Sequence, residues 1–172
     1  KPDIALIGDI NQYSADKILE YAGVPKGRKV DVIVGGPPCQ AFSSAGARRG
    51  LDDERGNVFL TFIDRIVEIQ PTYAVIENVR GLLSSEFPYS DELTLEECVE
   101  AGIEPIKGGA LLYILRRLRE AGYSVSFELY NAANFGAPQI RERVVMIAYQ
   151  GNEKVGYLTP THSENGEYGL PK

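Results

Sequence analysis

The feature that most constrains this chain is the alternation of short apolar runs with segments of helical periodicity. Apolar runs rich in β-branched and aromatic residues recur at Ile4–Ile7, Val30–Val34, Tyr73–Ile76, Val125–Leu129 and Val144–Tyr149. Runs of this kind are typical of buried strands. Strands that alternate with helices build a mostly parallel sheet covered on both faces. We therefore predict an α/β doubly wound fold, in which the last two strands have no helix between them and form an antiparallel pair.

Three segments between these runs have the spacing of amphipathic helices. The first follows Ser14, a residue type that caps helix starts, and ends at Gly23. The second runs from about Val58 to just before Pro71, because proline disfavours the helical conformation of the residue before it. The third carries four leucines at helical spacing within 111–122. These helices supply the connections that a doubly wound sheet requires.

Length and charge limit the organisation of the chain. With 172 residues it suits a single domain. We assign residues 1–150 to one core, with a surface insertion at 84–109, and residues 151–172 to a linker toward a further domain. The formal net charge of −6 excludes nucleic-acid binding by positive charge spread over the whole surface, so any DNA contact must be local. The absence of a long apolar stretch in the sequence makes the cytoplasm the expected compartment.

The strongest local signal is the segment Gly35 to Ser44, which follows the second apolar run. Two glycines and two prolines, Pro37 and Pro38, place Cys39 at the carboxyl end of a buried strand. Open α/β sheets bind their ligands at that end. Considered by itself, such a cysteine is more often an inert packing residue. Its neighbours in the predicted fold therefore decide whether it is a nucleophile.

Two other segments bring polar groups to the same edge of the predicted sheet. The next strand leads directly into Glu77, so a carboxylate arises at its carboxyl end. Arg141 and Arg143 precede the last strand, where alternation directs both side chains to one side. Separately, these would be an exposed loop glutamate and a solvated strand edge. Together with Cys39 they predict a single crevice.

In this order, the three segments resemble the DNA cytosine-5 methyltransferase family. Pro37-Pro38-Cys39-Gln40 with Phe42-Ser43 is similar to the nucleophile motif of the family, Glu77-Asn78-Val79 to its glutamate motif, and Gln139-x-Arg141-x-Arg143 to its paired-arginine motif. The resemblance covers most of the chain apart from residues 84–109. It implies a Rossmann-like methyltransferase sheet, S-adenosylmethionine as cofactor, and double-stranded DNA as substrate.

The resemblance also implies a role for each matched residue. Cys39 would add to carbon 6 of cytosine as a thiolate, with Arg141 as the candidate for nearby positive charge. Glu77 would protonate or hydrogen-bond ring nitrogen 3, and Arg143 would hold the carbonyl oxygen of the base and help orient Glu77. The cofactor would contact Asp9, Ile10 and Val58, and the substrate would contact Pro37, Pro38, Gln40, Ser43, Asn78 and Gln139.

Two further expectations concern the DNA and metals. The ring faces of a stacked cytosine are inaccessible, so the target base must be flipped out of the duplex, and the loop Gln40–Gly56 would close over the DNA backbone. No metal is expected, because the sequence contains a single histidine, His162, without a cluster of partners.

The sequence also departs from the family in ways that leave alternatives open. It lacks the glycine-rich turn that holds the methionine end of the cofactor, the acidic residue for the ribose, and the target-recognition domain. We therefore expect an interior portion of a bacterial or phage modification enzyme, with an incomplete sheet. A tRNA cytosine-5 methyltransferase would carry the same motifs. A non-catalytic relative or one subunit of a split enzyme would bind a second chain, although retention of Cys39, Glu77 and both arginines argues against a non-catalytic protein.

Overall fold

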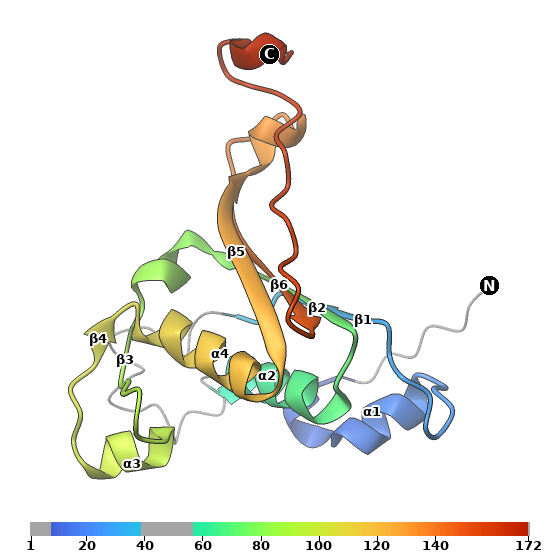
Figure 1. Cartoon of the computed structure of the whole chain (residues 1–172), viewed down its shortest axis with the longest axis vertical. Helices are drawn as coiled ribbons and strands as arrows, with labels where there is room; N and C mark the ends of the chain where they lie inside the picture. Colours follow the sequence, from blue (N-terminus) through green and yellow to red (C-terminus); the bar gives the residue numbers. More distant parts are fainter. Residues whose placement is uncertain (1–7, 39–56, 172) are drawn as a thin grey trace.

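A computed structural model describes residues 8–38 and 57–171, apart from the side chains of Asn57 and Tyr168. Its main sheet has the strand order β1-β2-β6-β5 (Figure 1). These strands are β1 (Val32–Gly35), β2 (Tyr73–Val79), β5 (Tyr123–Asn131) and β6 (Glu142–Gln150). β1 is parallel to β2, and β6 is antiparallel to both β2 and β5. Three strands therefore point one way and the final strand the other, which confirms the predicted sheet. The expected strand Ile4–Ile7 lies outside the described residues.

The three predicted helices are present with bounds close to those expected. They are α1 (Ala15–Tyr21), α2 (Asn57–Ile69) and α4 (Gly109–Glu120). The hydroxyl of Ser14 accepts a hydrogen bond from the backbone N–H of Lys17 at 3.3 Å, so Ser14 is the N-cap of α1. A 3₁₀ turn, η1 (Ile10–Gln12), precedes α1 and packs beside α2. The hydroxyl of Thr61 in α2 donates to the side-chain oxygen of Asn11 at 2.7 Å. This bond ties the first described turn to the second helix.

The hydrophobic core lies between the sheet and the two helices α2 and α4. Its most buried members are Phe59, Ile63 and Ile66 of α2, Ala110, Ile114 and Leu118 of α4, and Ala74, Ile76, Val144, Met146 and Ala148 of the strands. Each large side chain of this kind stabilises the fold by about 1.5–3 kcal/mol on burial. Alternation along β2 sends Ala74 and Ile76 into the core, so Glu77 emerges on the opposite face. Core packing therefore determines where the candidate carboxylate points.

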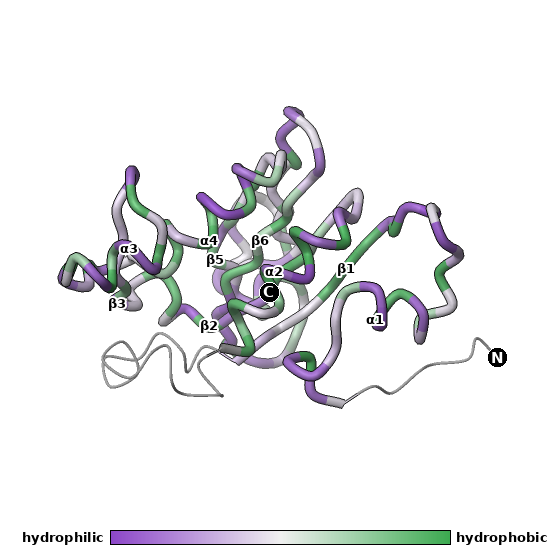
Figure 2. The backbone as a smooth tube through the Cα atoms, turned by 90° about the horizontal axis from the view of Figure 1, so that it is seen from below, coloured by the Kyte–Doolittle hydropathy of each residue, from purple (hydrophilic) through white to green (hydrophobic). Residues whose placement is uncertain are grey.

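The other face of the sheet is less covered by the described residues. In the sheet formed by the described residues, β1 is an edge strand, and its Val32 and Val34 are 49% and 70% exposed. Figure 2, which shows the molecule from below, draws β1 largely in hydrophobic green at one side of the sheet. The hydroxyl of Ser126 donates to the carbonyl of Val155 at 2.7 Å, so the segment that follows β6 lies along β5. Helices covering both faces were predicted, and the described helices α2 and α4 cover one.

The insertion at 84–109 is more regular than its sequence suggests. It follows the 3₁₀ turn η3 (Arg80–Ser84) and contains β3 (Glu86–Phe87), α3 (Leu95–Glu100) and β4 (Ile106–Lys107). A capping box formed by Thr94 and Glu97 starts α3. The guanidinium of Arg116 in α4 donates to the carbonyls of Ser90 and Leu93 at 2.6 and 2.7 Å. These bonds hold the insertion against α4, at the lower left of Figure 1.

The β5–β6 pair extends well beyond the helices, as the upper part of Figure 1 shows. The 3₁₀ turn η4 (Ala132–Phe135) follows β5, and a last 3₁₀ turn, η5 (Glu167–Gly169), lies near it. The carbonyl of Asn134 accepts from the backbone N–H groups of Thr161 and His162 at 2.9 and 3.0 Å. The segment after β6 is thereby returned to the end of the sheet at which β6 begins.

We expect Tyr123→Phe to change the alkaline stability of the fold. The buried hydroxyl of Tyr123 donates to the carbonyl of Pro71 at 2.8 Å, and burial raises the pKa of Tyr123 to about 12. An unfolded tyrosine ionises near pH 10, at about its unperturbed pKa. The neutral phenol therefore stabilises the folded state below pH 10, and this contribution is lost as the pH rises from about 10 to about 12. Urea unfolding at pH 9 and pH 11 measures it. The wild type should exceed the variant in stability at pH 9, and that advantage should shrink at pH 11. An advantage that stays constant contradicts this prediction.

Candidate active site

The centre of the candidate site is a contact between Glu77 and Arg143. Glu77 lies near the end of β2, and Arg143 is the second residue of β6. The guanidinium Nε of Arg143 is 2.7 Å from the carboxylate Oε1 of Glu77. The antiparallel register, in which Val79 faces Arg143, brings these residues together from positions far apart in the sequence. Both side chains are only partly exposed, so a base placed here would meet a carboxylate and a guanidinium at once.

The loop after β1 lies directly against this carboxylate. The side-chain amide of Asn78 donates to the carbonyl of Pro37 at 2.9 Å. A Cβ added at Gly36 would lie 2.9 Å from Oε2 of Glu77, so the loop backbone passes beside the carboxylate. Pro37 is half-buried and Pro38 is exposed. The described part of the nucleophile motif is therefore in contact with the glutamate motif.

The start of β6 is held by a second set of contacts. The guanidinium of Arg80 is 2.9 Å from the carboxylate of Glu142, which joins the end of β2 to the start of β6 beside the Glu77–Arg143 pair. The side-chain oxygen of Asn131 accepts from the backbone N–H of Arg141 at 3.2 Å. Arg141 itself is exposed and precedes β6. Its backbone is thus anchored at the site edge, while its side chain is open to solvent.

The predicted site residues fall into two groups. Glu77, Asn78, Arg143 and Pro37 are brought together, and Arg141 enters the same end of the sheet. Gln139 is exposed in the loop before β6. Cys39, Gln40, Ser43 and the loop Gln40–Gly56 lie outside the described residues. Cys39 is two residues beyond Pro37 in the sequence, and its role stays a prediction.

The residues expected at the cofactor also lie close together. Asp9 caps η1, and its carboxylate accepts from the backbone N–H of Asn11 at 2.9 Å. Asp9 is exposed, whereas Ile10 and Val58 are half-buried. The bond between Thr61 and Asn11 places this turn beside the first part of α2, which contains Val58. An exposed carboxylate next to two apolar side chains fits an adenosyl group, which has a flat apolar ring and hydrogen-bond donors.

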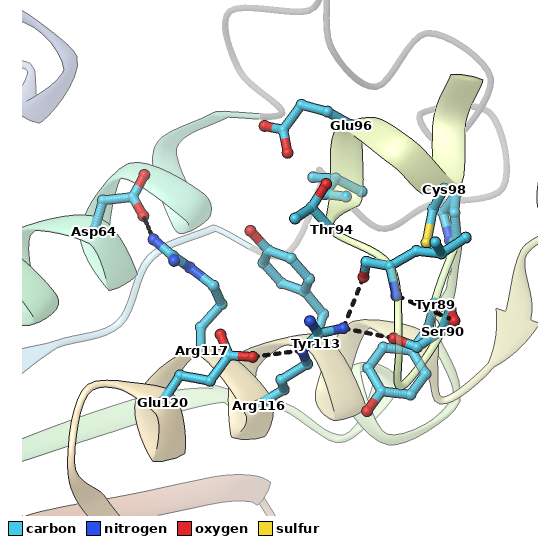
Figure 3. Close-up of a pocket in the computed structure, with 13 residues that line it drawn as sticks. Asp64, Tyr89, Ser90, Thr94, Glu96, Cys98, Tyr113, Arg116, Arg117 and Glu120 are labelled. Carbon is cyan, nitrogen blue, oxygen red and sulfur yellow. Dashed lines mark hydrogen bonds and ion pairs between the residues drawn. The ribbon is translucent and has the colours of Figure 1, made fainter. Parts of the chain in front are cut away.

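A cavity of about 210 Å³ lies at the insertion, away from these residues (Figure 3). It is lined by α3 and α4 and includes Cys98, Tyr113, Arg116 and Arg117. The guanidinium of Arg117 is already paired with Asp64 at 2.7 Å, and Arg116 is paired with Glu120 at 2.7 Å. Cys98 is 1% exposed, as expected for a packing residue. The cavity does not border Glu77 or Arg143.

The acidic character of the chain is concentrated in the insertion. Residues 84–109 contain seven carboxylates and one lysine, so their formal charge of −6 equals that of the whole chain. All seven carboxylate residues are exposed. The remainder of the chain is therefore formally neutral, and the described charged residues at the Glu77–Arg143 edge include Arg80, Arg141 and Arg143 against Glu77 and Glu142. Within the described residues, no group of three or more histidine, cysteine or acidic side chains could hold a metal ion. No helix of the described part is long and apolar enough to cross a membrane.

The C-5 cytosine-specific DNA methylase family model matches residues 4–169 of the chain. The chain therefore belongs to this family, as its ordered motifs predict. It is 36% identical over 167 residues to the type II methyltransferase M.AquIA of Picosynechococcus sp., a match that covers 96% of this chain and 62% of that protein. It is 33% identical over 163 residues to the type II methyltransferase M1.HphI of Haemophilus parahaemolyticus, covering 94% of this chain and 38% of the relative.

A solved structure shares the fold. The Entamoeba histolytica methyltransferase EhMeth matches with a TM-score of 0.60 and 15% identity, covering 94% of this chain and 43% of that one. A match at this identity supports the Rossmann-like sheet alone. The chain thus spans less than two thirds of the length of each of these relatives.

Three residues at the site were not found from the sequence. In the sequence, Gly36 is only one of the two glycines before Pro37, yet it is the one that lies beside Glu77. Arg80 and Glu142 lie next to the recognised motifs but are 62 positions apart. Their opposite charges at the two strand ends are the sequence signal for this ion pair. That signal identifies the pair only when the register between β2 and β6 is known.

Proposed function

We propose that this chain carries the catalytic centre of a cytosine-5 methyltransferase that acts on double-stranded DNA. The observation that carries the proposal is the contact between Glu77 and Arg143 beside the Pro37 loop. This edge offers a carboxyl group and a guanidinium, and Cys39, the proposed thiol nucleophile, follows Pro37 by two residues in the sequence. A pyrimidine ring needs these three groups when it is attacked at carbon 6. Membership of the family supports DNA as the substrate.

The reaction begins with Cys39. Carbon 5 of cytosine is a poor nucleophile, so the ring must first be activated. The thiolate Sγ of Cys39 forms a bond to carbon 6, and ring nitrogen 3 receives a proton or a strong hydrogen bond from Glu77. Arg143 holds the carbonyl oxygen of the base and orients Glu77 through the ion pair between them. The product of this addition is an enamine whose carbon 5 is nucleophilic.

The second half of the reaction restores the aromatic ring. Asp9, Ile10 and Val58 would hold S-adenosylmethionine, which would supply the methyl group to carbon 5 and leave as S-adenosylhomocysteine. The proton on carbon 5 then leaves to a base, the bond between Sγ and carbon 6 breaks, and nitrogen 3 returns its proton to Glu77. Cys39 is regenerated as the thiolate. The base must be flipped out of the helix for these groups to reach both ring faces.

The direct test of this function is methyl transfer by the full-length gene product, so that any further segments encoded with these residues are present. The protein is incubated with S-adenosylmethionine labelled on the methyl group and with duplex DNA or tRNA in parallel. We expect label in 5-methylcytosine of the DNA. Label in the tRNA alone would show that the substrate is tRNA and that the chemistry is the one proposed. An absence of label in both contradicts the proposal.

We expect the 172 residues alone to bind S-adenosylmethionine weakly and to transfer no methyl group. Among the described residues, β1 is an edge strand with exposed valines, and the sequence lacks the glycine-rich turn that holds the methionine end of the cofactor in the family it resembles. Calorimetric titration of the chain with the cofactor measures this, with the full-length gene product as the positive control. Stoichiometric binding by the chain alone would show that further segments are dispensable.

A further inference from the structure

We infer that Asn78 is a positioning residue, whose side-chain amide holds the loop that carries Cys39 against the strand that carries Glu77. This inference rests on the proposed function and gives Asn78 a role other than substrate contact. Asn78 is 3% exposed and makes two hydrogen bonds. Its Nδ2 donates to the carbonyl of Pro37 at 2.9 Å, and its Oδ1 accepts from the N–H of Val79 at 2.8 Å.

Both partners of Asn78 are backbone groups, so the direction of each bond is determined. A carbonyl can only accept and an N–H can only donate, which allows a single orientation of the amide. A buried amide that lost either partner would be destabilising. The bond to Pro37 is therefore maintained whenever this part of the protein is folded.

The prolines explain why a side chain is needed here. The parallel ladder between β1 and β2 ends where Gly35 faces Ile76. Pro37 and Pro38 have no N–H to continue the ladder, so the loop cannot be held to β2 by ordinary strand pairing. The carbonyl of Pro37 remains available, and Asn78 binds it. The side chain thus replaces the backbone bond that the prolines remove.

A second contact holds the loop from the neighbouring residue. A Cβ at Gly36 would approach Oε2 of Glu77 to 2.9 Å, so the loop backbone lies against the carboxylate. Glu77 and Asn78 are consecutive in β2 and project to opposite faces of the strand. The loop is therefore bound by Asn78 on one face and packs against the Glu77 carboxylate on the other, and Pro38 alone separates Pro37 from Cys39 in the sequence. This arrangement limits how far the loop backbone at Gly36 and Pro37 can move relative to Glu77, and Cys39 follows Pro37 by two residues in the sequence.

The test uses Asn78→Asp in the full-length gene product. Aspartate keeps the shape and the acceptor for Val79, but it turns an acceptor toward the Pro37 carbonyl where the amide donated. We expect kcat to fall by roughly 10- to 100-fold, since displacement of a catalytic group by about 1 Å costs that much. KM for DNA and for the cofactor should change by less than about twofold if Asn78 touches neither.

The matched control is Tyr123→Phe. It also removes a buried side-chain bond to a proline carbonyl, at 2.8 Å, but at the other end of β2. Both variants should lose thermal stability, whereas kcat should fall only in Asn78→Asp. An equal kcat for the two variants would overturn the inference. A rise in KM for DNA with unchanged kcat would also overturn it, because it would make Asn78 a substrate contact.

Hydrogen exchange tests whether Asn78 holds the Pro37 loop, without relying on activity. In Asn78→Asp, the amides of Gly35, Gly36 and Cys39 should exchange faster than in the wild type, and those around Tyr123 should not. Absence of methyl transfer by the wild type would contradict the proposed function. Unchanged hydrogen exchange at the Cys39 amide in Asn78→Asp would instead overturn the inference that Asn78 holds the loop. If Asn78→Asp does not fold, Gly36→Ala probes the packing of the same loop against β2 from the other face of the strand, where the loop meets Glu77. We expect the added methyl to displace Glu77 and lower kcat, and a wild-type kcat in that variant overturns the inference.

Discussion

Replacing Cys39 with serine is expected to lower the rate of methyl transfer by roughly a thousandfold or more, in line with the loss of nucleophiles in other covalent enzymes. A thiol with a pKa of about 8.5 is a few per cent ionised near neutrality, whereas a serine hydroxyl is far less ionised. The two side chains are almost equal in size. The variant should therefore fold and bind DNA while failing to activate the cytosine ring.

The control for Cys39→Ser is Cys98→Ala. Cys98 is the second of the two cysteines in the chain and is buried within the insertion, in α3. This control should lose some thermal stability through lost packing but retain its turnover per folded molecule. The measurement is the initial rate of methyl incorporation into duplex DNA, normalised to the folded fraction. If the turnover of Cys39→Ser were close to that of the wild type, the proposed role of Cys39 as the nucleophile would be wrong.

Replacing Glu77 with glutamine is expected to lower kcat by about 10²–10⁴-fold, the usual contribution of a general acid or base. Glutamine keeps the shape of the side chain but has no carboxyl proton to deliver to ring nitrogen 3. It also cannot form the ion pair that joins Glu77 to Arg143 at 2.7 Å. DNA binding, measured by fluorescence anisotropy, should persist because the change leaves the rest of the surface intact.

The matched control for Glu77→Gln is Glu20→Gln. Glu20 is paired with Lys17 at 2.9 Å on α1, so the control also removes one carboxylate and one ion pair. An exposed pair of this kind contributes little stability. Turnover of the control should equal that of the wild type. Equal rates for Glu77→Gln and Glu20→Gln would show that Glu77 has been given the wrong role.

Local signals in the sequence predict much of the fold. Ser14 caps α1 as expected, because a capping side chain acts on backbone groups within its own turn. The absence of a helix between β5 and β6 predicts their antiparallel pairing. The insertion was harder to predict, because α3 is too short for a visible period. Its local signal was the pair Thr94 and Glu97, which form the capping box.

Contacts that depend on strand order could not be predicted. β6 lies between β2 and β5, and nothing in the apolar runs specifies that order. The pair formed by Arg80 and Glu142 follows from it. The hydrogen bond of Asn78 to Pro37 is harder still to predict from the sequence, because its acceptor is a backbone carbonyl, which every residue type supplies. Motifs identify the chemical groups, whereas the register determines which of them touch.

The most direct test of the central claim is trapping of the full-length gene product on duplex DNA that contains 5-fluorocytosine. Fluorine at carbon 5 cannot leave as a proton does, so once the methyl group has been added, the bond between Sγ and carbon 6 cannot be eliminated. We expect a denaturation-resistant protein–DNA adduct that requires S-adenosylmethionine and maps to the peptide containing Cys39. No adduct, or an adduct at a residue other than Cys39, would contradict it.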